Sequence, residues 1–342
     1  MPRLFDPLNI KNVALRNRIV FAPVVTNFGL RNKQAVKYFT ERARGGVGLI
    51  IVHGTPVDRF GDASWARGLR TLVAAVHEQG AKVAIQLWHG NELNGQAVAP
   101  SARGSCREIT KEEIRMVIDK FATAAMRCQE TGFDGVEVHG AHGYFIHQFF
   151  SPLTNQRVDE YGGNVEKRMF FAMELIVAMR QVVGQSLLLI YRHSAVDGLP
   201  GGASIEESAR FAKALENHWL DVMDVSAGFG QGDGLSIPEV SAPEGTHATL
   251  AGQIRASVSI PVIAVGRVQT RAVAEKILEA GNADLVALGR QLLADPYWPK
   301  KVQEGREGEV VLCNYCNFCG EEMRAGRPIA CPQNPSLGRE GG

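Results

Sequence analysis

PVIAVGRVQTRAVAEKILEAGNADLVALGR, residues 261–290, follows a strand–helix–strand pattern. Short runs of Val, Ile, Ala and Leu at its two ends flank residues 271–280, where apolar residues recur at helical spacing. Continuous apolar runs, rather than strict alternation, are typical of parallel strands buried on both faces. Gly281 follows the helical segment as a common helix stop. The stretch predicts a βαβ unit, and both of its strands end in Gly-Arg.

The same pattern extends back through the chain. The predicted strands are 18–23, 48–54, 82–88, 135–140, 187–193, 222–228, 261–267 and 284–290. The predicted helices are 36–44, 65–79, 111–131, 166–183, 205–217, 247–257, 271–280 and 291–303. Eight βα units in sequence predict an α/β protein with a closed (β/α)8 TIM barrel; an open doubly wound sheet is the alternative. Before the first strand, LNI–KN–VAL (8–15) predicts a hairpin that plugs the barrel floor.

Composition excludes several classes of protein. The 342 residues carry a net charge of only +1, so no basic surface suggests nucleic acid or an acidic membrane. No run of about 18 apolar residues predicts a membrane span. The N-terminal segment MPRLFDPLNIKN has no apolar core of signal-peptide length. We therefore expect a soluble cytoplasmic protein.

Active sites of barrel enzymes lie at the carboxyl ends of the strands. The fourth strand runs into HGAHGY, residues 139–144. His139 and His142 are spaced so that both imidazoles could donate to one oxygen atom and polarise a carbonyl. The phenol of Tyr144 could deliver a proton. A zinc site is the alternative, although no nearby carboxylate completes a set of ligands.

The two Gly-Arg pairs predict a phosphate site. Gly266-Arg267 and Gly289-Arg290 follow the seventh and eighth strands, where barrels commonly bind phosphate. Glycine lets backbone N–H groups approach an anion closely, and arginine supplies a bidentate charged group. The alternative is that the arginines pair with carboxylates at the barrel rim. The longer connections 90–108 and 228–246 lie at the same end of the barrel and should shape a pocket.

Four of the six cysteines lie close together near the C-terminus. Cys313, Cys316, Cys319 and Cys331 form a C-x2-C-x2-C-x11-C pattern, followed by Pro332. Thiolates at this spacing are typical of a cubane iron–sulfur cluster. A structural zinc site and unligated thiols are the alternatives. We expect two parts: the barrel over 1–308 and a short cysteine-rich extension over 309–342.

The motif around His139, His142 and Tyr144 resembles that of the old yellow enzyme family of FMN-dependent ene reductases. Three other stretches resemble the same family: LFDPLNIKNVALRNRIVFAP (4–23), AIQLWHG (84–90) and SPLTNQRVDEYGGNVEKRMFF (151–171). The resemblance implies reduction of the C=C bond of α,β-unsaturated carbonyl compounds with NAD(P)H. His139 and His142 would bind the substrate carbonyl, FMN N5 would give hydride to the β-carbon, and Tyr144 would protonate the α-carbon.

The resemblance also implies an FMN site. The backbone of Pro23, Val24 and Val25 would lie along the flavin. Gly54 and Gln86 would contact the ring, and Arg192 would lie near N1. Arg267, Gly289 and Arg290 would hold the phosphate. Val25 departs from the family, since many relatives have threonine or cysteine there to hydrogen-bond the flavin; Thr26 is the neighbouring hydroxyl.

The cysteines are similar to those of larger relatives: 2,4-dienoyl-CoA reductase, 2-enoate reductases and trimethylamine dehydrogenase. These carry a [4Fe-4S] cluster just after the barrel, and they continue into a nucleotide-binding region. No GxGxxG-type unit follows the cysteines here. Electrons would therefore enter from NAD(P)H or from a separate protein partner, or the sequence is a truncated form of a longer enzyme.

Two other functions stay open at this stage. One is an amine dehydrogenase or demethylase that passes electrons out through the cluster, although the related amine dehydrogenase has tyrosine where His139 stands. The other is an electron carrier or redox sensor without turnover. The choice between NADH and NADPH, the physiological small-molecule substrate and the oligomeric state, including a homo-oligomer, also stay open.

Overall fold

The computed structural model describes residues 2–230 and 233–340. Eight parallel strands form a closed barrel in the order β10-β11-β12-β13-β3-β4-β5-β9. The closing pair joins β13 to β3, with Val286 opposite Ile19. The strands are β3 (Ile19–Phe21), β4 (Leu49–Pro56), β5 (Lys82–Trp88), β9 (Gly135–Gly140), β10 (Leu188–Ser194), β11 (Val222–Ser226), β12 (Val262–Val265) and β13 (Leu285–Leu288). The TIM barrel prediction is confirmed, with strand ends that differ from the predicted ones by at most two residues.

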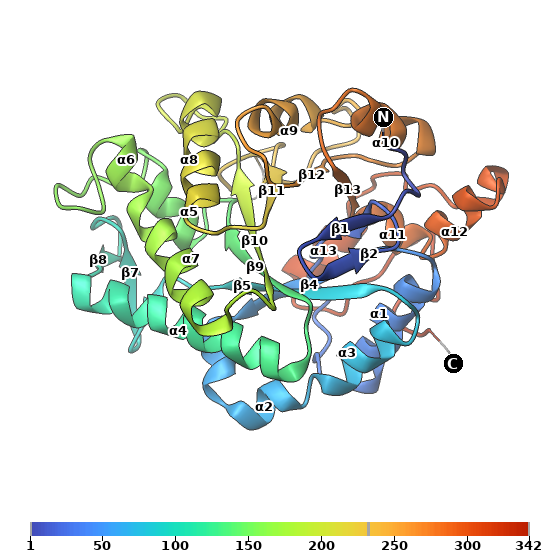
Figure 1. Ribbon diagram of the computed structural model, residues 1–342, viewed down its shortest axis with the longest axis horizontal. Helices are drawn as coiled ribbons and strands as arrows, with labels where there is room; N and C mark the ends of the chain where they lie inside the picture. Colours follow the sequence, from blue (N-terminus) through green and yellow to red (C-terminus); the bar gives the residue numbers. More distant parts are fainter. Residues whose placement is uncertain (1, 231–232, 341–342) are drawn as a thin grey trace.

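Helices surround the barrel (Figure 1). The outer helices of the βα units include α1 (Lys33–Arg44), α3 (Arg70–His77), α4 (Lys111–Thr131), α7 (Phe170–Val183), α8 (Ile205–Asn217), α9 (Ala248–Arg255) and α10 (Arg271–Glu279). Shorter pieces are η1 (Val57–Gly61), α2 (Ala63–Arg67), α5 (Phe145–Phe150), α6 (Val165–Arg168), α11 (Arg290–Ala294), α12 (Trp298–Gln303), η2 (Glu307–Glu309) and α13 (Phe318–Arg324). Glu113 and Glu207 complete capping boxes at the starts of α4 and α8, which fixes where these two helices begin.

Three helices predicted as continuous are each divided in two. The predicted range 65–79 is interrupted between α2 and α3 at Gly68, and 166–183 is interrupted at Met169 between α6 and α7. The predicted range 291–303 is interrupted at Asp295, which precedes Pro296 and is extended at φ −140° and ψ 98°. Proline disfavours the helical region for the residue before it, so α11 ends there and α12 starts afresh.

The hairpin predicted before the first barrel strand is present. Strands β1 (Leu8–Ile10) and β2 (Val13–Leu15) pair antiparallel. Their buried residues Ile10, Val13 and Leu15 pack in one cluster with apolar side chains of the barrel strands, among them Ala84 and Ile190. The hairpin therefore covers one end of the barrel interior, as the sequence predicted, and leaves the other end to the functional site.

Two further segments complete the barrel's other end. The 90–108 connection forms a small sheet of β6 (Glu92–Leu93), β7 (Gln96–Ala99) and β8 (Arg107–Glu108), and residues 231–232 of the 228–246 connection lie outside the described residues. The segment after η2 packs back on the start of the barrel. The N–H of Ile329 bonds the carbonyl of Thr26, and buried Glu340 pairs with buried Arg42.

Candidate functional site

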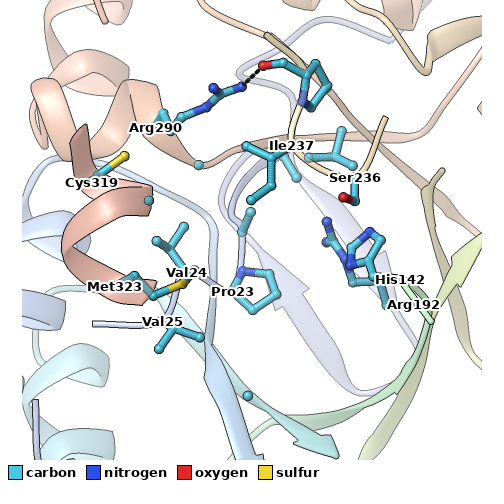
Figure 2. Close-up of a pocket in the computed structure, with 18 of the residues that line it drawn as sticks. Pro23, Val24, Val25, His142, Arg192, Ser236, Ile237, Arg290, Cys319 and Met323 are labelled. Atoms are coloured by element: carbon cyan, nitrogen blue, oxygen red, sulfur yellow. Dashed lines mark hydrogen bonds between the residues drawn. The ribbon is translucent and has the colours of Figure 1, made fainter. Parts of the chain in front are cut away.

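One cavity of about 360 Å³ lies at the carboxyl ends of the barrel strands. This volume is within the range of small-molecule sites. Its lining includes all twelve residues that the sequence assigned to catalysis or to the flavin: Pro23, Val24, Val25, Gly54, Gln86, His139, His142, Tyr144, Arg192, Arg267, Gly289 and Arg290. In Figure 2, His142 and Arg192 lie on one side and Cys319 and Met323 on the other, with Pro23, Val24 and Val25 nearby.

The three predicted catalytic side chains meet at one end of the cavity. The imidazole centroids of His139 and His142 are 5.3 Å apart, and the Tyr144 ring centroid lies 4.8 Å from that of His139. Trp88 contacts the other side of Tyr144, with centroids 5.7 Å apart. A ligand oxygen between the imidazoles would therefore lie close to the phenol, which is the arrangement expected for carbonyl polarisation with proton delivery.

The backbone that carries these side chains is tightly constrained. His142 has a φ of 60° and Gly143 a φ of 71°, so two successive residues are left-handed. A Cβ atom on Gly143 would lie 2.0 Å from the carbonyl oxygen of Phe229. Only glycine fits at position 143. This sharp turn ends β9 and places Tyr144 directly before α5.

A buried imidazole braces the same turn from behind. Nδ1 of His147 accepts the N–H of Gly143 at 2.9 Å, and its Nε2 lies 3.0 Å from a carboxylate oxygen of Asp197. The other Asp197 oxygen accepts from Ser151 Oγ and from the N–H of Ala203. His147 does not line the cavity, and its contacts with Gly143 and Asp197 make it a support for the turn.

Two serines orient His142. Ser226 Oγ lies 2.8 Å from His142 Nε2, and Ser194 Oγ accepts the backbone N–H of His142. Burial lowers the pKa of His142 well below its usual value, and Arg192 adds to the effect. Burial, with Arg192 and His147, lowers the pKa of His139 to about 3. Both rings are therefore neutral near pH 7, and each has a single N–H to donate.

The two arginines at the other end of the cavity have no acidic partners. Among the described residues, no salt bridge includes Arg267 or Arg290. Arg290 instead donates to the carbonyl of Pro238 at 2.7 Å (dashed in Figure 2) and to Asn317 Oδ1 at 3.3 Å. The Nε of Arg267 is buried without a hydrogen-bond partner. The alternative of rim carboxylates therefore finds no support, and the unpaired charge suits an anion.

Comparison with known proteins now identifies the family. A model described as "NADH:flavin oxidoreductase / NADH oxidase family" matches residues 3–309. The chain belongs to this family. An NADPH dehydrogenase of Geobacillus sp. (strain WCH70) is 40% identical over 86% of this chain and 92% of its own length. The resemblance to the old yellow enzyme family is thereby confirmed, and family membership supports FMN as cofactor and NAD(P)H as electron donor.

Longer members of the family match the chain from end to end. An NADH oxidase of Thermoanaerobacter brockii is 40% identical over 99% of this chain, which spans 57% of that protein. A solved structure of 2-naphthoyl-CoA reductase superposes with a TM-score of 0.92 and 30% identity, over 99% of this chain and 58% of its own length. The chain thus spans a little over half the length of these relatives, and the matches include its cysteine-rich segment.

Residues that follow the family match, which ends at residue 309, form one wall of the cavity. Tyr315, Asn317, Cys319, Met323 and Ile329 all line it. The ring of Tyr315 lies between the two arginines, 4.4 Å from the guanidinium carbon of Arg267 and 4.6 Å from that of Arg290. Sequence reasoning did not place any of these residues at the cavity, and it named only Cys319, as a cluster ligand, because it treated the extension as a separate cluster-binding unit.

A polar layer beneath the cavity was also missed. Gln86 and Arg192, which line the cavity, are bonded below to Glu137 and Asp224. Both acids lie in strand runs that otherwise look like ordinary buried β-structure, so only their charge could have drawn attention to them. Thr26 contributes nothing to the cavity lining; its hydroxyl accepts the N–H of Phe28 instead.

The four C-terminal cysteines gather on one side of the barrel but form no single-ion site. Cys313 and Cys331 pack in one small apolar cluster with Tyr315, and Cys319 lines the cavity. Among the described residues, no group of three or more His, Cys, Asp or Glu side chains is arranged to hold a metal ion. In the same part of the chain, no helix is long and apolar enough to cross a membrane.

Proposed function

We propose that the protein is an NAD(P)H-dependent FMN enzyme that reduces the C=C bond of activated alkenes, α,β-unsaturated carbonyl compounds. The observation that carries the proposal is the meeting of two neutral imidazoles and a phenol at one end of a cavity with two unpaired arginines at the other. The first group suits a carbonyl substrate, and the second suits the phosphate of a flavin nucleotide.

The residues present fit FMN. Arg267 and Arg290 would hold the phosphate, because both line the cavity and, in the part of the chain that the structure describes, neither pairs with a carboxylate and the Nε of Arg267 has no hydrogen-bond partner. Gly289 leaves room for a phosphate near its backbone, since a Cβ atom at this position would have no neighbour closer than 3.5 Å. The backbone of Pro23, Val24 and Val25, with Gly54, Gln86 and Arg192, would line the isoalloxazine ring.

FMN, when bound, supplies hydride transfer between NAD(P)H and the alkene. The protein's own residues would orient the substrate. His139 and His142 would each donate one N–H to the carbonyl oxygen, which places positive hydrogen-bonding groups where negative charge develops. Tyr144 would hold its proton beside the α-carbon. Trp88 and the apolar cavity wall would exclude water from the reacting atoms.

The test removes both imidazoles. For His139→Ala combined with His142→Ala, we expect loss of phenol binding and a fall in enone turnover of about 100-fold or more, since two transition-state hydrogen bonds are lost. Retained FMN absorbance would show that the barrel is intact. Enone turnover and phenol binding that survive the change would overturn the site. Turnover of methylated amines with an electron acceptor, in place of enones, would favour the amine dehydrogenase alternative.

We also propose that Cys313, Cys316, Cys319 and Cys331 bind a [4Fe-4S] cluster. Burial raises the pKa of Cys313 and Cys331, and burial raises that of Cys319 to about 11, so the bare thiols are neutral. A cluster would replace this cost with metal–sulfur bonds, and it separates its sulfur ligands more widely than a zinc ion does. Iron and sulfide analysis, with the visible spectrum of anaerobically purified protein, tests the assignment; flavin bands alone would contradict it.

A cluster at this position would let a separate redox protein exchange electrons with the flavin. Cys316 is exposed, and Cys319 lines the cavity, so the cysteine segment joins the surface to the proposed flavin site. Reduction of the cluster by NAD(P)H in the purified protein would support such a route. A flavin that turns over normally after the cluster is removed would show that electrons enter from NAD(P)H alone.

A further inference from the structure

The barrel interior contains an acid pair that the proposed mechanism does not use. Glu137 on β9 and Asp224 on β11 are both fully buried, at 0% exposure. Residues two apart on a strand face the same side, so Glu137 lies one layer below His139 and Asp224 one layer below Ser226. The pair therefore occupies the layer directly beneath the cavity, between it and the apolar barrel floor.

The hydrogen bonds of this layer tie it to the cavity. Gln86 Nε2 donates to Glu137 Oε2 at 2.7 Å, and Arg192 Nη1 donates to Asp224 Oδ2 at 2.5 Å. Gln86 and Arg192 both line the cavity. The two acids would therefore influence a bound flavin indirectly, through Gln86 and Arg192, the two side chains proposed to contact its ring.

Charge counting shows that the layer is short of one positive charge or holds one extra proton. The two carboxyl groups share a single guanidinium, that of Arg192, and both lie out of water. The nearby imidazoles of His139, His142 and His247 are neutral, because burial and Arg192 lower their pKa values. A second, unpaired carboxylate at this depth would be strongly disfavoured.

The unpartnered atoms point to the same conclusion. Oε1 of Glu137 and Oδ1 of Asp224 are buried, and neither has a hydrogen-bond donor among residues 2–230 and 233–340. The two carboxyl groups lie within hydrogen-bonding reach of each other. A proton kept on one carboxyl group could be donated as a hydrogen bond to the other. Burial, with the neighbouring Asp224 charge, raises the pKa of Glu137 well above its usual value, which agrees with a retained proton.

We propose that Glu137 stays protonated at neutral pH and donates a hydrogen bond to Asp224. This proton fixes the net charge of Glu137, Asp224 and Arg192 at the flavin edge. This inference rests on the flavin site proposed above. With the proton in place, Glu137, Asp224 and Arg192 sum to zero charge. Without it they sum to −1, and added electrons on the flavin would meet a negative layer. Glu137 is thus a positioning residue: it acts on the proposed flavin through Asp224 and Arg192, without touching it.

Infrared absorption spectra of the FMN-bound wild type, compared with those of each variant, test the proton directly. At neutral pH, we expect the carbonyl stretch of a protonated carboxylic acid, lost in Glu137→Gln. It should also be lost in Asp224→Asn, because Glu137 then ionises to pair with Arg192. The matched control is Asp134→Asn, a partly buried acid that pairs with His77 and Lys82 away from the cavity, and it should keep the band. No band in the wild type would overturn the proposal.

The flavin reduction equilibrium against a reference dye tests the consequence. Glu137→Gln should match the wild type within about threefold at neutral pH, since both layers are neutral. Toward alkaline pH the wild type should lose reduced flavin relative to Glu137→Gln, by at most about tenfold for each pH unit between the Glu137 pKa of the oxidised protein and that of the reduced protein. A tenfold difference already at neutral pH would mean that Glu137 is ionised. Protein that binds no FMN but shows the band would refute the flavin site and leave the shared proton standing.

Discussion

At the scale of single residues, the Ser226 hydroxyl decides which nitrogen of His142 can serve a substrate. A neutral imidazole has one N–H, and Ser226 Oγ lies 2.8 Å from Nε2. If the serine donates, the N–H of the ring is on Nδ1 and is free for a ligand oxygen. With Ser226 as the donor, His142 presents an N–H to the cavity.

Replacing Ser226 by Ala should therefore weaken phenol binding and slow enone turnover. A hydrogen bond of this kind contributes about 0.5–1.5 kcal/mol, so the loss should be about threefold to tenfold in each quantity. Phenol titration followed by flavin absorbance, with steady-state kinetics, measures both. The matched control is Ser208→Ala, which removes the same type of contact from His193 outside the cavity and should leave both quantities unchanged. An equal loss in the two variants would contradict the role of Ser226.

Tyr315 joins the phosphate end of the cavity to the cysteine segment. Its ring lies between the guanidinium groups of Arg267 and Arg290, and contacts of this type contribute about 0.5–2 kcal/mol each. Tyr315→Leu should weaken FMN binding by about tenfold or more, because both arginines lose the aromatic ring that they contact. Tyr315→Phe keeps the ring and should stay within about threefold. Fluorescence titration of FMN measures the affinity, and equal affinities in all three proteins would refute the idea.

The strand-end argument reached His139, His142, Tyr144 and the two Gly-Arg pairs, because barrel chemistry concentrates at strand ends. The family resemblance supplied the other residues of the predicted site, and all twelve line the cavity. Sequence prediction failed for Tyr315, whose neighbours in the chain are cysteines with a stronger signal of their own. It failed also for Glu137 and Asp224, because a buried acid in a strand has no sequence spacing that marks it. Their partners come from other strands and are visible only after the barrel closes.

At the scale of elements, the turn between β9 and α5 depends on the buried His147–Asp197 contact. Both side chains are fully buried, and His147 also accepts the N–H of Gly143. Breaking a buried pair costs about 3–5 kcal/mol. His147→Ala should therefore lower the free energy of unfolding by about 3 kcal/mol and reduce enone turnover together with phenol affinity, because the turn carries His142 and Tyr144.

Another His–Asp contact provides the comparison. His77 Nε2 lies 2.7 Å from Asp134 Oδ2, but the His77 side chain is 35% exposed and does not line the cavity. Exposed pairs contribute at most about 1 kcal/mol, so His77→Ala should have a small effect on unfolding in urea and none on phenol affinity. Comparable losses in both variants would show that the His147 contact has no special link to the turn.

Among the helices, the predicted ranges 111–131 and 205–217 coincide with α4 and α8. α4 and α8 begin after Thr110 and Ser204, whose side chains cap them. The divided helices were missed because an amphipathic pattern continues across a break, while the backbone at Asp295 is set by the following proline. The small sheet in 90–108 was missed because its strands are only two to four residues long.

At the scale of the whole molecule, buried imidazoles should make the fold sensitive to acid. Burial lowers the pKa of His139 and His193 to about 3 and that of His247 to about 4. In the unfolded chain these rings titrate near their usual pKa of about 6.5. Between these values the unfolded state binds more protons than the folded state, so stability is complete above about pH 6.5 and falls as the pH decreases.

Each such histidine should remove about 1.4 kcal/mol of unfolding free energy per pH unit below this point. Urea unfolding at fixed FMN concentration, between neutral pH and about pH 5, measures the slope. His193→Gln removes one buried ring outside the cavity. It should reduce the slope by about 1.4 kcal/mol per pH unit, which corresponds to one proton. A slope that the variant leaves unchanged would mean that His193 is protonated in the folded protein.

The overall architecture was the most predictable level. Eight apolar runs separated by helical segments leave few arrangements other than a closed parallel barrel, and the hairpin at its floor follows from a short turn between two apolar triplets. The packing of residues 310–340 across the opposite end of the barrel was harder to predict from the sequence. It depends on single contacts between distant parts of the chain, such as that of Arg42 with Glu340.

The late position of Tyr315, Asn317, Cys319, Met323 and Ile329 in the chain sets an order of events during synthesis. The ribosome makes all eight barrel strands before it makes this wall of the cavity. Until these residues pack, the cavity is open on that side, whereas the apolar cluster under the hairpin consists only of residues that come earlier in the chain. Tight retention of FMN would then require residues 315–329 to have packed beside the two arginines.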